Sequence, residues 1–342
     1  MTKLIFKEIK EINEAVLKIK SDQLLIIIDQ SLWTLYKSKL SFLTANTTDK
    51  KIIVWKAPSG EDTKNLDEYA KAQEYFIEKG IHRKSHLLAI GGGATSDFAG
   101  FVAATILRGI SWSIIPTTLL SQVDASIGGK VAVNTNNYKN LIGAFHIPEN
   151  VFISSEFFKT LPESEFNSGL GEVIKYAFLS DGVKDFILKG SGLDKVIKKC
   201  SEYKLELTQR DLKESGERKL SNLGHTFGHG LEKIYNLPHG VAVYWGMALI
   251  FKVFDKNECL DLLRTLSAKL EVEFGEEPWL NRTFPVKKIM SHISKDKKVL
   301  STTKIELLLP EKNNEITIQP FELSELEEKL EIQKNELRKF KL

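Results

Sequence analysis

Residues 87–104 read LLAIGGGATSDFAGFVAA, and three consecutive glycines, Gly91, Gly92 and Gly93, separate an apolar run from a stretch rich in Ala and Gly. The apolar run is typical of a buried strand, and the stretch that follows is typical of a closely packed helix. Glycines at such a turn let the backbone approach a phosphate, which the free N–H groups at the helix start would bind. The spacing GGGxxxD differs from the GxGxxG dinucleotide fingerprint, so a plain tight turn is the alternative to nucleotide binding.

The same alternation of strand and helix extends over the first half of the chain. Short β-rich runs cover residues 24–28, 52–55, 86–90 and 112–115, and a helical pattern covers residues 66–80. This alternation predicts βαβ units around a parallel sheet. Asp29 directly follows the first run, where a carboxylate can bind a ribose hydroxyl or simply cap a helix.

After about residue 161 the pattern becomes mainly helical. Helical spacing covers residues 163–179, 196–212 and 240–254, two β-like runs at 304–309 and 315–318 can form a hairpin, and the charged tail at 322–342 is typical of a solvated helix. We therefore predict an α/β + all-α protein. A Rossmann-like parallel-sheet domain would occupy residues 1–161, and a mainly helical domain residues 162–342.

Composition argues against several classes of protein. The 342 residues carry 48 basic and 45 acidic side chains, a net charge of +3, and no basic stripe interleaved with aromatic residues, so nucleic acid is not an expected partner. The longest apolar run, residues 241–251, is shorter than the roughly 18 residues of a membrane span and is expected to be a buried helix. Residues 1–20 are charged throughout, unlike a signal peptide, and the two cysteines, Cys200 and Cys259, have no metal-binding spacing. We expect a cytoplasmic protein whose partners are small molecules.

Three of the seven histidines lie in NLGHTFGHGLEKIYNLPHG, residues 222–240. His225 and His229 are four residues apart, so on a helix they would share a face and could bind one divalent metal. Glu172 in the apolar run GLGEVIKYA could supply a carboxylate ligand. Spacing favours His225 with His229 but leaves open which two of the three histidines, His239 included, bind the metal; structural histidines are the alternative. Nitrogen and oxygen donors without cysteine suggest Zn²⁺ first, then Fe²⁺, Co²⁺ or Mn²⁺.

Seven motifs in one order resemble the 3-dehydroquinate synthase family. They are GGGATSD, IPTTLLSQVDASIGGKVAVN, KNLIGAFH, TLPESEFNSGLGEVIKYA, GERKLSNLGHTFGHGLE, HGVAV and KDKK, and they span residues 91–298. The resemblance implies a dehydroquinate synthase-like fold and a carbon–oxygen lyase that converts 3-deoxy-D-arabino-heptulosonate 7-phosphate into 3-dehydroquinate and phosphate in the shikimate pathway. It also implies NAD, a divalent metal that is zinc or cobalt, a homodimer, and a reaction of transient oxidation, phosphate elimination and aldol cyclisation.

The resemblance also implies residue roles. Its metal ligands are Glu172, His225 and His239, which overrules the spacing preference and leaves His229 for proton transfer. The implied catalytic residues are His229, Lys130, Lys175, Arg218 and Asn222. The implied cofactor contacts are Asp29, Glu61, Lys64, Gly92, Gly93, Asp97, Thr117, Thr118, Asp124, Lys130, Lys139, Thr160 and Glu165. The implied substrate contacts are Lys130, Asn140, Lys175, Lys204, Arg218, Asn222, His229, one of Lys297 and Lys298, and Arg108 from a neighbouring subunit.

Two residues depart from the family pattern. Ser96 stands where the family usually has Gly, and Val241 stands where it usually has Glu, which would remove a partner near His239. The alternative to the synthase is an NAD- and metal-dependent polyol or alcohol dehydrogenase of the same fold. Such an enzyme does not need the group formed by Lys204, Arg218 and Asn222. A sugar-phosphate cyclase whose substrate lacks a carboxylate and a catalytically silent binding module are further alternatives.

Overall fold

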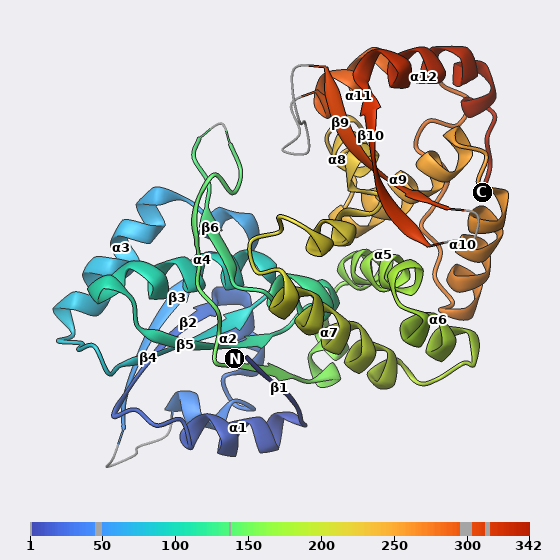
Figure 1. Ribbon diagram of the computed structural model, residues 1–342. Coiled ribbons are helices and arrows are strands. Elements are labelled where there is room, and N and C mark those ends of the chain that lie inside the picture. The colour runs from blue at the N-terminus through green and yellow to red at the C-terminus, as the bar shows by residue number, and fades with distance from the viewer. Residues whose placement is uncertain (1, 45–49, 137, 295–302, 312–314) are drawn as a thin grey trace. The chain divides into compact units, whose positions relative to one another are not determined.

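The computed structural model describes the chain except residues 1, 45–49, 137, 295–302 and 312–314 (Figure 1). The described residues form two compact units. The first comprises Met1–Pro162 with Ser201–Lys213, and the second comprises Glu163–Cys200 with Glu214–Leu342. The sequence-based domain boundary after residue 161 assigns residues 201–213 to the mainly helical domain. In the structure, the contacts of this segment make it part of the first unit.

The first unit is built around a six-stranded parallel sheet. In spatial order its strands are β1 (Lys3–Phe6), β8 (Asn150–Ile153), β5 (Ser111–Pro116), β4 (His86–Gly91), β2 (Gln23–Asp29) and β3 (Lys51–Ala57). Strands β2 to β5 confirm the sequence-based expectation. The short strands β1 and β8 were not expected, because each has only four residues and lacks the length that distinguishes a strand from a loop.

Helices cover both faces of this sheet (Figure 1). The helices are α1 (Ile9–Leu17), α2 (Gln30–Tyr36), α3 (Leu66–Glu78) and α4 (Gly93–Thr105), with short 3₁₀ helices at Ser41–Thr44, Gly60–Thr63, Ile106–Arg108 and Ser155–Thr160. Ile12 and Val16 of α1 pack in one apolar cluster with Ile26 and Ile28 of β2. Helices α3 and α4 lie on the opposite face, so the central strands are buried on both sides, which explains their nearly continuous apolar sequence.

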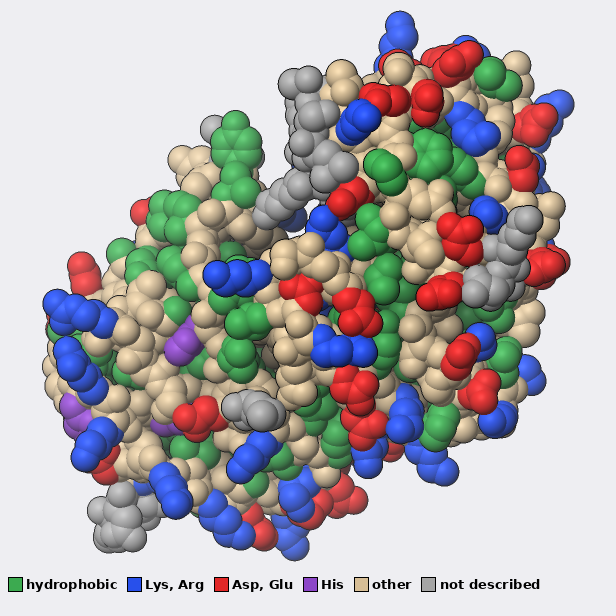
Figure 2. Space-filling model, viewed as in Figure 1, with side chains coloured by type: hydrophobic (Ala, Val, Ile, Leu, Met, Phe, Trp, Pro, Cys, Tyr) green, Lys and Arg blue, Asp and Glu red, His purple; other side chains and the backbone are tan. Residues whose placement is uncertain are grey.

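A hairpin of β6 (Lys130–Val133) and β7 (Ile142–Phe145) projects from the first unit, and a π-helical turn, Ser121–Ala125, precedes it. Hydrophobic side chains gather over this hairpin in Figure 2; Tyr138, Leu141, Phe145 and Ile147 are exposed. Exposed apolar groups gathered on one element are typical of an interaction surface.

The second unit is mainly helical, as expected. Its elements are α5 (Glu163–Leu179), α6 (Asp181–Leu188), the first part of α7 (Leu193–Arg210), the 3₁₀ helix Glu217–Asn222, α8 (His225–Tyr235), α9 (His239–Val253), α10 (Asn257–Lys269), α11 (Val286–Ile293), β9 (Lys304–Pro310), β10 (Ile316–Glu322) and α12 (Leu323–Leu337). Every residue of α9 from Gly240 to Phe251 is buried, and α5, α8 and α10 pack against it. The apolar run at 241–251 is therefore the central helix of this unit.

The expected hairpin and terminal helix both form. Strands β9 and β10 pair in antiparallel fashion, although residues 312–314 at their connection lie outside the described residues. Helix α12 is not fully solvated, because Leu326, Leu330 and Leu337 form one buried row on it. Among the described helices, none combines the length and the apolarity needed to cross a membrane.

A buried histidine links three strands of the sheet in the first unit. The His86 ring pairs through Nδ1 with Ser111 Oγ at 3.0 Å and through Nε2 with Ser113 Oγ at 2.9 Å, and Asn150 donates to the same Ser113 hydroxyl. Burial, aided by the charge of Lys50, lowers the pKa of His86 from 6.5 to about 4. The ring is therefore neutral in the folded protein at neutral pH.

Acid should destabilise the first unit through this histidine. Below pH 6.5 the unfolded chain binds a proton at His86 that the folded chain excludes until about pH 4, so stability falls across that window. The loss amounts to about 2–3 kcal/mol between pH 7 and pH 4.5. Urea unfolding of the wild type and of His86→Gln at both pH values measures it. The variant should lose less stability by that margin, and an equal loss in both proteins would contradict the prediction.

Candidate active site

The strand order of the first unit reverses between β2 and β4. The chain runs from β2 to its neighbour β3 on one side and then continues through β4 and β5 on the other. In doubly wound sheets, ligands bind at the carboxyl ends of the strands where the order reverses. Asp29 ends β2, and Gly91 ends β4, so two of the sequence motifs meet at this point of the sheet.

The glycine turn after β4 has no room for side chains. A Cβ at Gly91 would lie 2.5 Å from Thr95 Cβ, and one at Gly92 would lie 3.0 Å from Thr118 Cγ2. The turn therefore leads directly into α4, with Gly92 at the N-cap, and leaves bare backbone at the helix start. Ser96 lies inside α4, where its N–H donates to Gly92 O at 3.0 Å. A helical residue needs no glycine freedom, so this departure from the family pattern causes no backbone strain.

Asp29 caps helix α2 in this structure. Its Oδ1 accepts hydrogen bonds from Ser31 N at 2.8 Å, Ser31 Oγ at 2.6 Å and Ser59 Oγ at 2.6 Å, and its Oδ2 accepts from Gly60 N at 3.2 Å. The carboxylate thus joins the ends of β2 and β3. The cap alternative is realised, and a contact with a ribose stays a prediction.

The buried Lys64 contacts three other residues that the family resemblance singles out. Lys64 Nζ lies 2.7 Å from Asp97 Oδ2, 2.5 Å from Asn140 Oδ1 and 4.0 Å from Glu61 Oε1. Burial raises the pKa of Asp97, while the neighbouring Lys64 charge opposes that change. The cluster ties the start of α4 to the loop that precedes β7.

The remaining sequence-predicted residues of the first unit are more dispersed. Lys204 on α7 forms an ion pair with Asp124 of the π-helical turn, and Ser201 Oγ donates to Gln122 O, which explains why Ser201–Lys213 belongs to this unit. Thr160 Oγ1 pairs with Tyr36 OH at 2.7 Å.

The other sequence-predicted residues of the first unit differ in their exposure to solvent. Thr117 is buried and Thr118 half-buried, whereas Arg108, Lys130 and Lys139 are exposed. In the second unit Glu165 is exposed, and both Lys297 and Lys298 lie outside the described residues.

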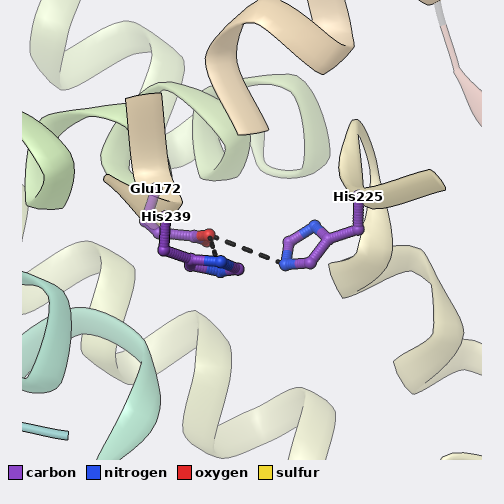
Figure 3. Close-up of side chains that lie close together, drawn as sticks. All are labelled: Glu172, His225 and His239. Carbon is purple, nitrogen blue, oxygen red and sulfur yellow. Dashed lines mark ion pairs between the residues drawn. The ribbon is translucent and has the colours of Figure 1, made fainter. Parts of the chain in front are cut away.

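Three side chains from three helices of the second unit converge on one point (Figure 3). Glu172 of α5, His225 at the start of α8 and His239 at the start of α9 each offer one ligand atom, and these atoms lie within 4.8 Å of one another. Glu172 Oε1 is 3.7 Å from His225 Nε2 and 3.4 Å from His239 Nε2. His229 is not in this group; its ring centroid is 5.4 Å from that of His225 and 6.1 Å from that of His239. The structure thus brings together the set that the resemblance implies rather than the i,i+4 pair.

The donor set fits a divalent metal. The Glu172 side chain is fully buried, and within the described part of the chain neither of its carboxylate oxygens has a hydrogen-bond partner. Lys175, on the next turn of α5, forms an ion pair with Oε2, and the two imidazoles face Oε1. A buried carboxylate without hydrogen bonds needs positive charge beside it. Two imidazoles and a carboxylate, with no thiolate, are the donors of catalytic zinc and related sites that keep an open position.

His239 has a second carboxylate partner that the sequence did not reveal. Its Nδ1 lies 3.0 Å from Glu232 Oε2, on the side of the ring away from Glu172. Burial lowers the pKa of His239, but the contacts with the carboxylates of Glu172 and Glu232 outweigh burial and raise it to about 10. An imidazole flanked by two carboxylates marks a position where positive charge is stabilised.

Glycines allow the three helices to approach closely enough for these side chains to meet. A Cβ on Gly240 would lie 1.7 Å from Ser168 O, and one on Gly171 would lie 2.1 Å from Gly240 O. Gly240 N also donates to Ser168 Oγ at 2.9 Å, so α5 caps the start of α9. Between α8 and α9, a Cβ on Gly246 would lie 2.1 Å from Gly224 O. Backbone-to-backbone contact of this kind excludes any larger residue.

Two further predicted residues lie in the 3₁₀ helix Glu217–Asn222. Arg218 is buried, and Asn222 Nδ2 donates to Glu214 Oε1 at 2.5 Å. Sequence reasoning missed Glu232 and Ser168. Glu232 had a detectable signal, since positions 225, 229 and 232 follow the i, i+4, i+7 spacing of one helix face. Ser168 had none, because its contact depends on the packing of α5 against α9.

Comparison of folds defines the class of protein first. A solved 2-epi-5-epi-valiolone synthase from Streptomyces hygroscopicus, with NAD⁺ and Zn²⁺ bound, superimposes with a TM-score of 0.81 at 21% identity, covering 98% of this chain and 97% of that one. A 2-deoxy-scyllo-inosose synthase complexed with carbaglucose-6-phosphate, NAD⁺ and Co²⁺ gives 0.76 at 21% identity, covering 96% and 95%. An iron-containing alcohol dehydrogenase from Corynebacterium glutamicum gives 0.61 at 16% identity, covering 96% and 94%. The chain has the fold of these cyclising synthases and dehydrogenases.

Sequence comparison then gives the family. The model of the 3-dehydroquinate synthase N-terminal domain matches residues 54–168, and that of the C-terminal domain matches residues 169–299. The 3-dehydroquinate synthase of Thermococcus kodakarensis is 42% identical over 249 residues, 67% of this chain and 72% of that protein. The enzyme of Staphylococcus aureus is 40% identical over 243 residues, 68% of each chain. The chain belongs to the 3-dehydroquinate synthase family, which confirms the resemblance found in its motifs.

Substituting Gly240 with Ala should separate α9 from α5. The added Cβ would overlap Ser168 O, so we expect a loss of about 1–3 kcal/mol in stability and at least a ~10-fold loss in affinity for a divalent metal. Gly182→Ala on α6 is the matched control, because its Cβ meets only Ser180 Oγ at 3.6 Å. Urea unfolding and chelator competition measure both quantities. Unchanged metal affinity in Gly240→Ala would contradict the role assigned to this close contact.

Proposed function

We propose that this protein is a carbon–oxygen lyase with 3-dehydroquinate synthase activity, converting 3-deoxy-D-arabino-heptulosonate 7-phosphate into 3-dehydroquinate and phosphate in the shikimate pathway of aromatic amino acid biosynthesis. Family membership over both domains supports this activity. The observation that carries the chemistry is the convergence of Glu172, His225 and His239 in the second unit. Three protein donors with open coordination positions suit a catalytic site.

We propose NAD and a divalent metal as cofactors, with zinc preferred and cobalt as the alternative. When bound, these groups would supply the transient oxidation and the charge stabilisation that phosphate elimination and ring closure require. Glu172, His225 and His239 would hold the metal. Bare glycine backbone at the start of α4 would accept the pyrophosphate of NAD, since helix N-termini bind anions. The two cyclising synthases of this fold were solved with NAD⁺ and Zn²⁺ or Co²⁺, which supports both assignments.

The cofactor contacts that we propose for NAD lie mostly in the first unit, and Asp29 and the glycine turn lie where its strand order reverses. They are Asp29, Glu61, Lys64, Gly92, Gly93, Asp97, Thr117, Thr118, Asp124, Lys130, Lys139 and Thr160, with Glu165 from the second unit. Asp29 already holds Ser31, Ser59 and Gly60, so a ribose would share a carboxylate that is fixed in place. Fixed acceptors lose little conformational entropy when a ligand binds.

Cations suited to a substrate with a phosphate and a carboxylate are held by their own partners. Lys175 pairs with Glu172, and Lys204 pairs with Asp124, so each ammonium is oriented before substrate arrives. The substrate contacts we propose are Lys130, Asn140, Lys175, Lys204, Arg218, Asn222, His229 and one of Lys297 and Lys298. His229, outside the three-donor group but on the same helix as His225, would transfer a proton.

We further propose that the protein is a cytoplasmic homodimer to which Arg108 of one chain contributes at its neighbour's site. Arg108 is exposed, so its side chain is accessible to another chain. The apolar side chains over the β6–β7 hairpin support an interface with another chain. Cys200 and Cys259 are buried thiols, which suits a reducing compartment. We assign NAD binding to residues 1–161, and metal and substrate binding to residues 162–342.

A polyol or alcohol dehydrogenase of the same fold is the alternative. It is less supported, because the relatives at 40–42% identity are 3-dehydroquinate synthases. A dehydrogenase would also have no use for a buried Arg218 beside Asn222.

The two functions differ in what they release. With NAD⁺, zinc and the seven-carbon keto-acid phosphate, the purified protein should liberate phosphate without accumulating NADH, because the hydride returns to the product in each turnover. A phosphate assay coupled to absorbance at the NADH wavelength measures both quantities, and chelation of the metal should abolish phosphate release. Stoichiometric NADH would instead identify a dehydrogenase.

Metal content should distinguish the proposed ligands Glu172 and His225 from His229. Glu172→Ala and His225→Ala each remove a donor, so metal affinity should fall by more than ~100-fold, whereas His229→Ala should keep its metal and turn over ~10²–10⁴-fold more slowly. Elemental analysis after gel filtration, together with steady-state kinetics, tests the assignment. Full metal occupancy in the Glu172 variant would refute the proposed ligand set.

A further inference from the structure

The residues that fix the His239 ring matter because this ring is the most accessible of the three proposed ligands. Its side chain is 36% exposed, compared with 10% for His225 and none for Glu172. Packing alone therefore restrains rotation of the His239 ring less than it restrains the other two. A metal ligand that can rotate must be ordered when the metal binds, and this lowers affinity.

Glu232 is placed to supply this restraint. It lies on the last turns of α8, and Asn236, with a left-handed φ of 53°, ends that helix and turns the chain toward His239 at the start of α9. Glu232 O accepts from Leu237 N at 3.1 Å, so the backbone of the same residue closes this turn. Its carboxylate reaches His239 Nδ1 at 3.0 Å across only seven residues of sequence. The contact is local and does not depend on the first unit.

The two sides of the imidazole then have different functions. Nδ1 faces Glu232, and Nε2 faces Glu172 Oε1 at 3.4 Å. When a cation takes the place of the Nε2 proton, Nδ1–H stays donated to Glu232 and Nε2 offers its lone pair. Carboxylates that accept from the outer nitrogen of a ligating histidine fix its tautomer and increase its basicity. Glu232 thus favours the tautomer that the proposed metal site needs.

The charge of Glu232 also matters. Glu172 carries one negative charge, and its ion-pair partner Lys175 carries one positive charge, so these two groups cancel. The Glu232 carboxylate places a second acidic group beside the His239 ring, which favours a cation at the donors. Val241 supplies no such charge, and on a helix positions 239 and 241 do not face each other. The carboxylate beside His239 comes from α8 rather than from α9.

We propose that Glu232 is a positioning residue: it holds Nδ1 of His239 so that Nε2 is presented to a divalent cation together with Glu172 and His225. This inference rests on the proposed metal site. Glu232 itself does not touch the cation.

The test measures metal affinity directly. Zn²⁺ and Co²⁺ dissociation constants of the full chain are determined by chelator competition for the wild type, Glu232→Gln and Glu232→Ala. Loss of the carboxylate should weaken metal binding by ~10-fold in Glu232→Gln and by up to ~100-fold in Glu232→Ala, and should change the visible absorption spectrum of the Co²⁺ form. Glu327→Gln on the exposed side of α12 is the matched control and should change neither.

Three results would overturn this role. Dissociation constants within twofold of the wild type in both variants would exclude it. A lower unfolding temperature of the metal-free variants with unchanged metal affinity would assign Glu232 to the α8–α9 turn instead. Combining Glu232→Gln with His239→Ala should weaken metal binding no further than His239→Ala alone, and an additive loss would show that Glu232 does not act through His239. If the wild type binds no metal at these residues, the proposed function fails as well.

Discussion

A buried carboxylate is tolerated only beside positive charge, and this constraint organises the second unit around Glu172. The side chain has no solvent access, and its cationic or ligand-type neighbours are Lys175 on its own helix and two histidines from α8 and α9. Those histidines reach it only because glycines let three helices touch backbone to backbone. The same arrangement that makes Glu172 costly without a cation is what makes it a ligand. The packing of the helices and the geometry of the proposed ligands therefore depend on the same residues. Gly240, for example, allows α9 to contact α5 and carries no side chain that would move His239 away from Glu172.

The sequence predicted those parts of the fold whose burial leaves a periodic pattern. Strands β2 to β5 are buried on both faces and stand out as apolar runs, and α9 is apolar on all sides. Strands β1, β6, β7 and β8 are four residues each, which is too short for a periodic pattern to distinguish a strand from a loop. Residues 201–213 belong to the first unit through pairs such as Lys204 with Asp124, and helical spacing cannot reveal a partner 80 positions away.

Some residues of the candidate site could also be predicted from sequence, and others could not. Spacing alone favoured His225 with His229, because i,i+4 positions share a helix face. The structure selects His239 instead, since the first residues of two different helices can lie closer than two positions along one helix. The family motifs imply this set from residue identity, without geometry, and the structure brings the three side chains together. Neither approach found Ser168, whose hydroxyl acts only once α5 and α9 are packed.

The two departures from the family pattern show why a motif position is best understood through the contact it makes. Ser96 replaces a glycine at a point where the backbone is helical, and the glycines with no room for a side chain, Gly91 and Gly92, precede it. Val241 replaces a carboxylate near a proposed ligand, yet the imidazole of His239 still has an acidic partner, because Glu232 approaches from α8. At the first position the requirement is an unobstructed turn, which Gly91 and Gly92 provide. At the second it is an acceptor for His239 Nδ1, which Glu232 provides. A substitution within a motif therefore argues against function only when no neighbouring residue can make the contact that was lost.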